Sequence, residues 1–273
     1  MLSAQSGAVQ NRAAVFLPGK REEEKEKIGA FPHCQKKADH AIMLAKKEKG
    51  AEKMDLDTGI FVFEILGVIA FAFSGAILAI RKCMDLLGVI VLAVTTAVGG
   101  GIIRDVILGI NPPMAFTSPE QTAIACLVSV VIFCAVAYCQ KKGIDSLFHK
   151  LDLYMTIFDA VGLAAFTVTG VSVAHGNSDG YNLFLYIFVG TLTGVGGGVL
   201  RDVMAGVMPS IFVRHVYALA SVLGAAVCSL LWHVNSALAM VLGAGVVVLI
   251  RALAIHYHWK LPRIKNPDKV GIK

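Results

Sequence analysis

Gly99-Gly100-Gly101-Ile102-Ile103-Arg104-Asp105 recurs 97 positions later as Gly196-Gly197-Gly198-Val199-Leu200-Arg201-Asp202, and both copies lie in strongly apolar stretches. Three consecutive glycines weaken a helix by roughly 1 kcal/mol each relative to alanine. A charged side chain in the bilayer core costs at least about 2.5 kcal/mol on insertion scales. A segment that only anchors a protein in a membrane needs neither feature, so the doubled motif indicates a specialised site.

The composition is that of a multi-pass membrane protein. Hydrophobic residues make up 56% of the 273 residues and the mean hydropathy is +0.69, whereas soluble domains contain roughly 45–50% apolar residues. A helix needs about 20 apolar residues to span a bilayer, and the last apolar run, 216–250, is long enough for two helices. The sequence therefore predicts an all-α fold with seven transmembrane helices, at 60–80, 86–108, 120–140, 154–175, 182–206, 213–232 and 237–257.

Basic residues are distributed unequally between the two sides of these helices. The side at the carboxyl end of the first helix carries 11 Lys and Arg residues in short connections and the C-terminal tail, while the loops near 110–119, 176–181 and 233–236 carry none. Lys and Arg are enriched in cytoplasmic connections. We therefore expect a cytoplasmic C-terminus, with the amino end of the first helix on the opposite side.

Residues 1–53 differ in composition from the rest of the chain. They contain 11 Lys or Arg and seven Asp or Glu residues, and weakly hydrophobic charged tracts of this kind are typical of disorder. They lack the apolar core of a signal peptide. One interpretation is that Met54 is the natural start and the preceding tract is an upstream extension. The alternative is a genuine soluble tail whose lysines bind the membrane surface.

The similarity between the two halves extends beyond the glycine motifs. Residues 64–75 align with residues 159–170 at an offset of 95. Each unit holds three predicted helices, an odd number, so the second unit must enter the membrane in the opposite orientation. The sequence thus predicts a 3+3 inverted repeat plus one helix, with a first repeat at 54–150, a second at 151–234, a seventh helix at 235–257 and a basic cytoplasmic tail at 258–273. A duplication that only builds a stable bundle is the alternative, but it gives no reason for Arg-Asp in both copies.

The glycines have two interpretations. Gly190, Gly194 and Gly198 share one helix face, as small residues do where two helices pack closely. The additional glycines at 99–100 and 196–197 favour an interrupted helix whose freed backbone groups face a water-filled cavity. Interrupted helices in inverted repeats indicate a substrate or permeation site near the midplane. We therefore expect helices two and five to be broken at their glycine triplets.

The charges beside the glycines require partners if they are buried. Adjacent residues of a helix point to different faces, so Arg104 is not expected to pair with Asp105. A two-fold relation between the repeats would instead permit crossed pairs, Arg104 with Asp202 and Arg201 with Asp105. The alternative is a pair of interfacial arginines that extend to the lipid headgroups.

Two further pairs of polar residues occupy equivalent positions in the repeats. Thr96 and Thr193 precede the glycines, where their hydroxyls can line a polar path or bond to their own helix, and both interpretations remain open. Glu64 and Asp159 are interpreted as carboxylates at helix starts, where the helix dipole favours negative charge.

The residues predicted to line a pore or bind a substrate are those of the two motifs together with these threonines: Thr96, Gly99, Gly100, Gly101, Arg104, Asp105, Thr193, Gly196, Gly197, Gly198, Arg201 and Asp202. The sequence contains no nucleophile with a positioned base and no nucleotide-binding loop, and its six cysteines lack metal-site spacing. We therefore expect no enzymatic activity, no cofactor and no metal. The expected partners are the lipid bilayer and a small ion or zwitterion, and not nucleic acid.

The blocks at 71–75, 84–88, 96–105 and 194–202 resemble bacterial members of the TRIC (trimeric intracellular cation channel) family, also catalogued as glycine-transporter-domain inner-membrane proteins. The resemblance covers about residues 60–257. It implies a homotrimer in the bacterial inner (plasma) membrane. It also implies that each seven-helix protomer encloses its own pore, with helices two and five kinked at the glycine triplets.

Three functions are compatible with these features. The leading hypothesis is a channel that conducts monovalent cations through a constriction at the paired breaks. The second is a secondary transporter of a small zwitterion such as glycine, whose carboxylate would meet Arg104, Arg201 or the amino end of a half-helix. The third is a scaffold that transports nothing.

Overall fold

The computed structural model describes residues 32–142, 145–178, 180–213 and 216–257, with side chains for residues 57–142, 151–178, 180–212 and 216–257. Every regular element in these ranges is a helix. The chain divides into two units, residues 1–54 and 55–273, and the expected divisions after residues 150 and 234 both fall inside the second unit. Residues 1–31 and the predicted tail 258–273 lie outside the described residues.

Six helices in the described ranges are long and apolar enough to cross a bilayer. They are the Asp57–Arg81 part of α2 (Pro32–Arg81), α3 (Leu86–Leu108), α5 (Pro119–Lys141), the Leu151–Gly176 part of α6 (Asp145–Gly176), α7 (Leu183–Met204) and α10 (Ser236–His256). A shorter apolar helix, α9 (Tyr217–Leu231), precedes α10, and the four-residue helices α4 (Met114–Thr117) and α8 (Ser210–Val213) follow α3 and α7. The seven predicted apolar helices are therefore found, the sixth of them shorter than expected.

The start of α2 differs from the prediction. It begins at Pro32 rather than near residue 60, so residues 32–53 are helical although their charged composition predicts disorder. These residues are rich in Ala, Lys and Glu, which are strong helix formers. The interpretation of Met54 as the natural start stays a prediction.

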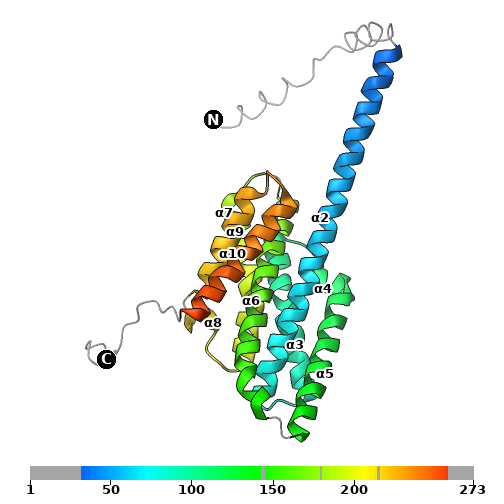
Figure 1. Ribbon diagram of the computed structural model, residues 1–273. Coiled ribbons are helices and arrows are strands. Elements are labelled where there is room, and N and C mark those ends of the chain that lie inside the picture. The colour runs from blue at the N-terminus through cyan, green and yellow to red at the C-terminus, as the bar shows by residue number, and fades with distance from the viewer. Residues whose placement is uncertain (1–31, 143–144, 179, 214–215, 258–273) are drawn as a thin grey trace, which may run out of the picture. The chain divides into compact units, whose positions relative to one another are not determined.

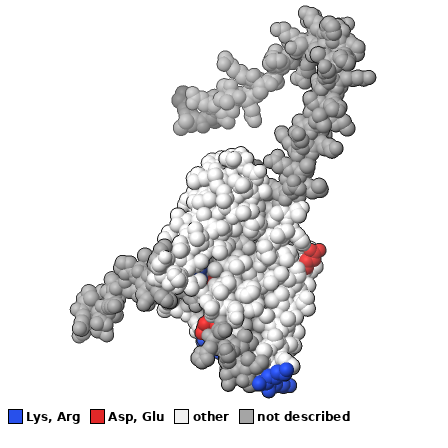
Figure 2. All heavy atoms as spheres, in the orientation of Figure 1, with Lys and Arg blue, Asp and Glu red and all other residues white. Residues whose placement is uncertain are grey.

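The surface of the bundle is suited to lipid. In Figure 2, uncharged atoms cover most of the described surface on the face shown, and charged groups gather at a few places. Large apolar side chains are exposed on three different spans, with exposed fractions of 68% for Leu87, 65% for Leu127 and 77% for Phe184. Soluble proteins avoid extended apolar patches, whereas a bilayer solvates them, so the surface supports a membrane location for these helices.

The two halves of the bundle meet through equivalent contacts. α6 runs through the middle of the bundle (Figure 1), where a methyl group at Gly162 would overlap the ring of Phe71 from α2. In the aligned positions, a methyl group at Gly67 of α2 would lie 3.1 Å from the ring of Phe166 of α6. The two rings pack with centroids 5.2 Å apart. A two-fold relation between the halves would produce this exchange of contacts. The contacts therefore support the predicted inverted repeat.

α3 and α7 pass through the glycine triplets without interruption. Residues 86–108 and 183–204 are helical throughout, so the predicted breaks at the triplets are not found in these ranges. The helices end further on, where Gly109 and Gly206 have φ values of +71° and +64°. Residues with a Cβ rarely adopt this left-handed conformation, so the chain uses glycine where it turns toward α4 and α8.

The triplets instead bring α3 and α7 into backbone contact. A methyl group at Gly100 would overlap the carbonyl oxygen of Thr193, and one at Gly197 would overlap the carbonyl oxygen of Thr96. The stripe of Gly190, Gly194 and Gly198 packs against α6 and α9. Small residues permit such close approach of helices, so the packing interpretation applies to the central glycine of each triplet as well as to the stripe.

Candidate functional site

Charged side chains are buried inside this apolar bundle. Among the described residues they are Glu64, Arg104, Asp105, Asp159, Arg201, Asp202 and Arg251. The exposed fractions of Arg104 and Arg201 are 3% and 0%, so neither side chain extends to the surface of the protomer as an interfacial arginine would. A buried charge is stable only with a partner, and these residues form two clusters, one around Arg104 and one around Arg201.

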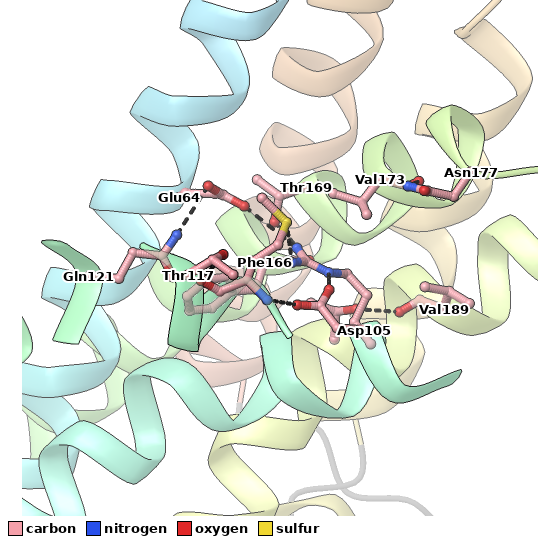
Figure 3. A network of polar contacts seen from close by, with 12 residues as sticks. Glu64, Asp105, Thr117, Gln121, Phe166, Thr169, Val173, Asn177 and Val189 are labelled. Atoms are coloured by element: carbon pink, nitrogen blue, oxygen red, sulfur yellow. Dashed lines mark hydrogen bonds and ion pairs between the residues drawn. The ribbon is translucent and has the colours of Figure 1, made fainter. Parts of the chain in front are cut away.

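The first cluster joins α2, α3, α4 and α5. The Nε of Arg104 donates a hydrogen bond to Oδ1 of Asp105 at 2.8 Å, and Nη1 lies 3.5 Å from Oε1 of Glu64. Gln121 donates from Nε2 to the other oxygen of Glu64 at 3.2 Å. Glu64, Asp105 and Gln121 converge from three helices in Figure 3. Nη2 of Arg104 is 3.5 Å from the sulfur of Met114, so this guanidinium contacts groups from α2, α3 and α4.

The second cluster joins α6, α7, α9 and α10. Arg201 donates from Nε to Oδ1 of Asp202 at 2.9 Å and from Nη1 to Oδ1 of Asp159 at 2.7 Å. The hydroxyl of Tyr217 donates to the same Asp159 oxygen at 3.3 Å. Nη2 of Arg251 lies 3.7 Å from Oδ2 of Asp159. Asp159 therefore contacts groups from three other helices.

One hydrogen bond connects the second cluster to the first half of the chain. Nη1 of Arg201 donates to the hydroxyl of Ser74 on α2 at 2.7 Å. Thr169, which occupies the aligned position on α6, donates instead to the carbonyl oxygen of Phe166 at 3.3 Å. The clusters thus occupy equivalent positions but do not have identical partners.

The aspartate of each motif also holds the short helix that follows. The backbone N–H of Met114, the first residue of α4, donates to Oδ2 of Asp105 at 2.7 Å. In the second half, the backbone N–H of Ser210, the first residue of α8, donates to Oδ2 of Asp202 at 2.7 Å. A carboxylate is favourable at the start of a helix, where the backbone N–H groups lack partners. Each aspartate therefore binds its arginine with one oxygen and a helix start with the other.

The predicted crossed ion pairs are wrong. Each arginine binds the aspartate next to it in its own helix, and the ion pairs of the described residues do not include Arg104 with Asp202 or Arg201 with Asp105. Although adjacent Cβ atoms diverge on a helix, the long arginine side chain brings its Nε back to the neighbouring carboxylate. The crossed arrangement would also have to displace these short bonds.

Glu64 and Asp159 were expected at helix starts and lie instead in helix interiors, because α2 begins at Pro32 and α6 at Asp145. Both are buried partners of an arginine. The sequence interpretation also missed Gln121, Tyr217 and Arg251 as members of the clusters. The signal for Arg251 is its position as the first charged residue after the apolar run 216–250.

The two threonines bond to their own helices. The Thr96 hydroxyl donates to the carbonyl oxygen of Leu92 at 2.6 Å, and the Thr193 hydroxyl to that of Val189 at 2.7 Å. Both side chains are fully buried. The structure thus favours the interpretation in which these hydroxyls satisfy backbone groups, and their place beside a pore stays a prediction.

Comparison with known sequences identifies the family. The family model described as Glycine transporter matches the chain twice, at residues 61–138 and 156–233. The UPF0126 inner membrane protein YadS of Escherichia coli (strain K12) is 36% identical over 207 residues, which are 74% of this chain and 95% of that protein. The UPF0126 membrane protein YvgT of Bacillus subtilis (strain 168) is 35% identical over 206 residues, 74% of this chain and 94% of that protein.

Solved structures agree with this assignment. A TRIC cation channel whose structure explains its conductance is 37% identical, with a TM-score of 0.65 over 75% of this chain and 97% of that one. The TRIC trimeric intracellular cation channel orthologue from Rhodobacter sphaeroides is 31% identical, with a TM-score of 0.65 over 73% of this chain and 98% of that one. The resemblance predicted from the motifs is confirmed. The chain belongs to the glycine transporter (UPF0126) family of membrane proteins and shares the fold of the TRIC cation channels.

Proposed function

We propose that the protein is a channel that passes monovalent cations across a membrane. The observation that carries this proposal is the balance of buried charge in the described residues. Four carboxylates (Glu64, Asp105, Asp159 and Asp202) accompany three guanidinium groups (Arg104, Arg201 and Arg251), so four minus three leaves one net negative charge. Fixed negative charge along a path favours cations over anions, and the related solved proteins are described as cation channels.

The passage that we propose runs beside the crossing of α3 and α7. Arg104 and Arg201 each lie four residues beyond the central glycine of their triplet, which is about 6 Å along a helix. The two clusters are therefore close to the crossing on their respective helices. The central glycines hold α3 and α7 in backbone contact at this crossing, and the Arg-Asp pairs would set the polarity of the path beside it.

We also propose a homotrimer in the bacterial inner membrane with a cytoplasmic C-terminus. The Rhodobacter sphaeroides relative is described as trimeric and the Escherichia coli relative as an inner membrane protein. The orientation rests on the distribution of Lys and Arg, 11 on one side and none in the loops of the other.

A secondary transporter of glycine is the second candidate, favoured by the description of the family model. The geometry favours the channel. Both arginines that could bind a substrate carboxylate already bind aspartates at 2.8–2.9 Å. A glycine molecule would have to displace an aspartate that also holds the start of α4 or α8. Because these arginines and aspartates already bind one another and the starts of α4 and α8, they have no evident role in covalent chemistry. We therefore propose a channel rather than an enzyme.

The full-length protein, purified and inserted into planar bilayers under a KCl gradient, tests the proposal. We expect discrete unitary currents whose reversal potential lies toward the K⁺ equilibrium potential. Liposomes containing the same protein should show no saturable uptake of labelled glycine. Saturable uptake without unitary currents would instead establish the transporter. If the protein shows neither currents nor uptake, the scaffold hypothesis is the one that remains.

A further inference from the structure

Arg251 has no counterpart in the first half of the chain. It is the one buried charge contributed by α10, the seventh apolar helix, which packs against α9 and α6. The other six buried charges of the described residues form equivalent pairs: Glu64 with Asp159, Arg104 with Arg201 and Asp105 with Asp202. The difference in formal charge between the two clusters therefore arises from Arg251.

The carboxylate that faces Arg251 is incompletely bonded. Asp159 is 1% exposed, and its Oδ1 accepts hydrogen bonds from Arg201 and Tyr217. Its Oδ2 is buried and accepts no hydrogen bond. Nη2 of Arg251 lies 3.7 Å from this oxygen, beyond the 2.7–3.2 Å range of an N–H···O bond. Arg251 thus compensates the charge of Asp159 without satisfying its second oxygen.

The guanidinium of Arg251 also contacts the ring of Tyr217. The guanidinium carbon lies 4.8 Å from the ring centroid, within the range of a cation–π contact. Tyr217 donates its hydroxyl to Asp159, so the same side chain positions both members of the long ion pair. The guanidinium therefore lies beside the carboxylate oxygen without a direct hydrogen bond to it, and the ring contact contributes to its position.

Among the described residues, the first cluster has no second arginine to neutralise the charge of its carboxylates. The second oxygen of Glu64 receives its hydrogen bond from the neutral amide of Gln121. Arg104 with Glu64 and Asp105 therefore carries a formal charge of one minus two, or −1. Arg201 and Arg251 with Asp159 and Asp202 carry two minus two, or zero.

We propose that Arg251 is a tethered counter-ion that competes with the permeating cation for Oδ2 of Asp159 and thereby limits conduction through the second cluster. A carboxylate oxygen that is buried, unbonded and faced by a positive group at long range has the chemistry of a monovalent cation site. K⁺ and the guanidinium carry the same charge, so one can replace the other there. Conduction requires sites that bind a cation and release it, and a permanently attached cation reduces the time for which such a site is free. This inference rests on the proposed channel function.

Unitary conductance as a function of KCl concentration tests the inference in the full-length protein. The variant Arg251→Gln removes the competing charge, and we expect it to raise the conductance at low KCl by about twofold or more, with the difference shrinking as KCl saturates the site. The double variant Asp159→Asn/Arg251→Gln removes the site as well and should abolish this gain. Arg81→Gln is the matched control, because it removes an arginine from an exposed ion pair with Asp152 and should leave the curve unchanged.

Several outcomes would overturn the inference. It fails if Arg251→Gln has the same conductance curve as the wild type, or if the gain persists in the double variant. If Arg251→Gln does not assemble, Arg251→Lys replaces it, since the shorter ammonium group reaches Asp159 less well and should give a smaller gain in the same direction. A curve for Arg251→Lys that matches the wild type would then overturn the inference. A wild-type protein without unitary currents would overturn the channel function itself.

Discussion

Gly100 of α3 lies directly against Gly197 of α7, so that a methyl group at Gly100 would be 3.3 Å from the backbone nitrogen of Gly197. The same methyl group would overlap the carbonyl oxygen of Thr193, and one at Gly197 would overlap that of Thr96. Backbone atoms cannot move aside as a flexible side chain can. The crossing therefore requires glycine at both positions, and the spacing between the two charged clusters depends on it.

Replacing Gly100 or Gly197 by alanine should destabilise the protein. Overpacking a close contact costs about 1–3 kcal/mol, which exceeds the gain of up to about 1 kcal/mol from helix propensity. Thermal unfolding in detergent, followed by loss of the folded protein in size-exclusion chromatography, measures the effect. Gly101→Ala is the matched control, because the nearest atom to its methyl group would be Nη2 of Arg104 at 3.9 Å, and it should be neutral or stabilising. Equal melting temperatures for Gly100→Ala and Gly101→Ala would refute the packing role.

Gly109 and Gly206 should tolerate alanine poorly for a different reason. Neither has a heavy atom within 4 Å of the added methyl group, but their φ values are +71° and +64°. A left-handed conformation costs an L-residue roughly 1–2 kcal/mol. Asparagine, which adopts this conformation more readily, should be less damaging than alanine in the same thermal assay. Gly59→Ala, in open space on α2, should not destabilise, and a similar loss there would show that the backbone conformation is not the cause.

Asp105→Asn should destabilise the protein more than Asp202→Asn. Loss of one partner from a buried ion pair costs about 3–5 kcal/mol, and in both variants an amide replaces a carboxylate that binds an arginine and a helix start. Arg201 retains Asp159 at 2.7 Å, whereas Arg104 retains only Glu64 at 3.5 Å. Melting temperatures of the two variants measure the difference.

The control for these variants is Asp85→Asn. Asp85 is an exposed N-cap of α3 that accepts from the N–H of Gly88 at 2.7 Å, and asparagine caps helices about as well as aspartate. We expect a change within about 0.5 kcal/mol. The reverse order of the two buried variants would show that the contact between Arg104 and Glu64 is stronger than its length indicates.

Glu64→Gln should reduce the selectivity of the channel for cations. It removes one of the four buried carboxylates and brings the formal charge of the described buried residues from −1 to zero. The reversal potential under a KCl gradient should move toward zero, because fixed negative charge excludes anions. Asp152→Asn, at a side chain that is 64% exposed, removes a surface carboxylate and should leave the reversal potential in place. An unchanged reversal potential in Glu64→Gln would mean that this carboxylate does not face the ion path.

The predictions from the sequence succeeded where a single helix is sufficient to decide the outcome. The length of the apolar runs predicted the positions of seven apolar helices, because the thickness of a bilayer sets the length of a span. The repeated Arg-Asp motifs led to the four residues at the centres of the two clusters. The boundaries of α3 at Leu86 and Leu108 agree with the predicted range. These features depend on local composition and on the cost of placing a charge in an apolar helix.

The predictions failed where side-chain contacts decide the outcome, within one helix for Arg104 and Asp105 and between helices elsewhere. The sequence does not show that Arg104 bends back to Asp105, that Gln121 and Tyr217 bind the carboxylates of Glu64 and Asp159, or that α10 brings Arg251 to Asp159. It also predicted that the helices are broken at the glycine triplets, whereas α3 and α7 continue through them and Gly100 and Gly197 are in packing contact.

The sequence by itself determined the membrane class, the internal repeat and the residues that carry charge into the apolar core, since these follow from hydrophobicity and self-similarity along one chain. The tertiary structure decided which charges are neutralised and which carboxylate oxygen remains unbonded. Those properties are set by distances of a few ångströms between groups that are far apart in the sequence, such as the 3.7 Å between Arg251 and Asp159. Electrostatic energies depend steeply on such distances, and they are fixed only when the helices pack.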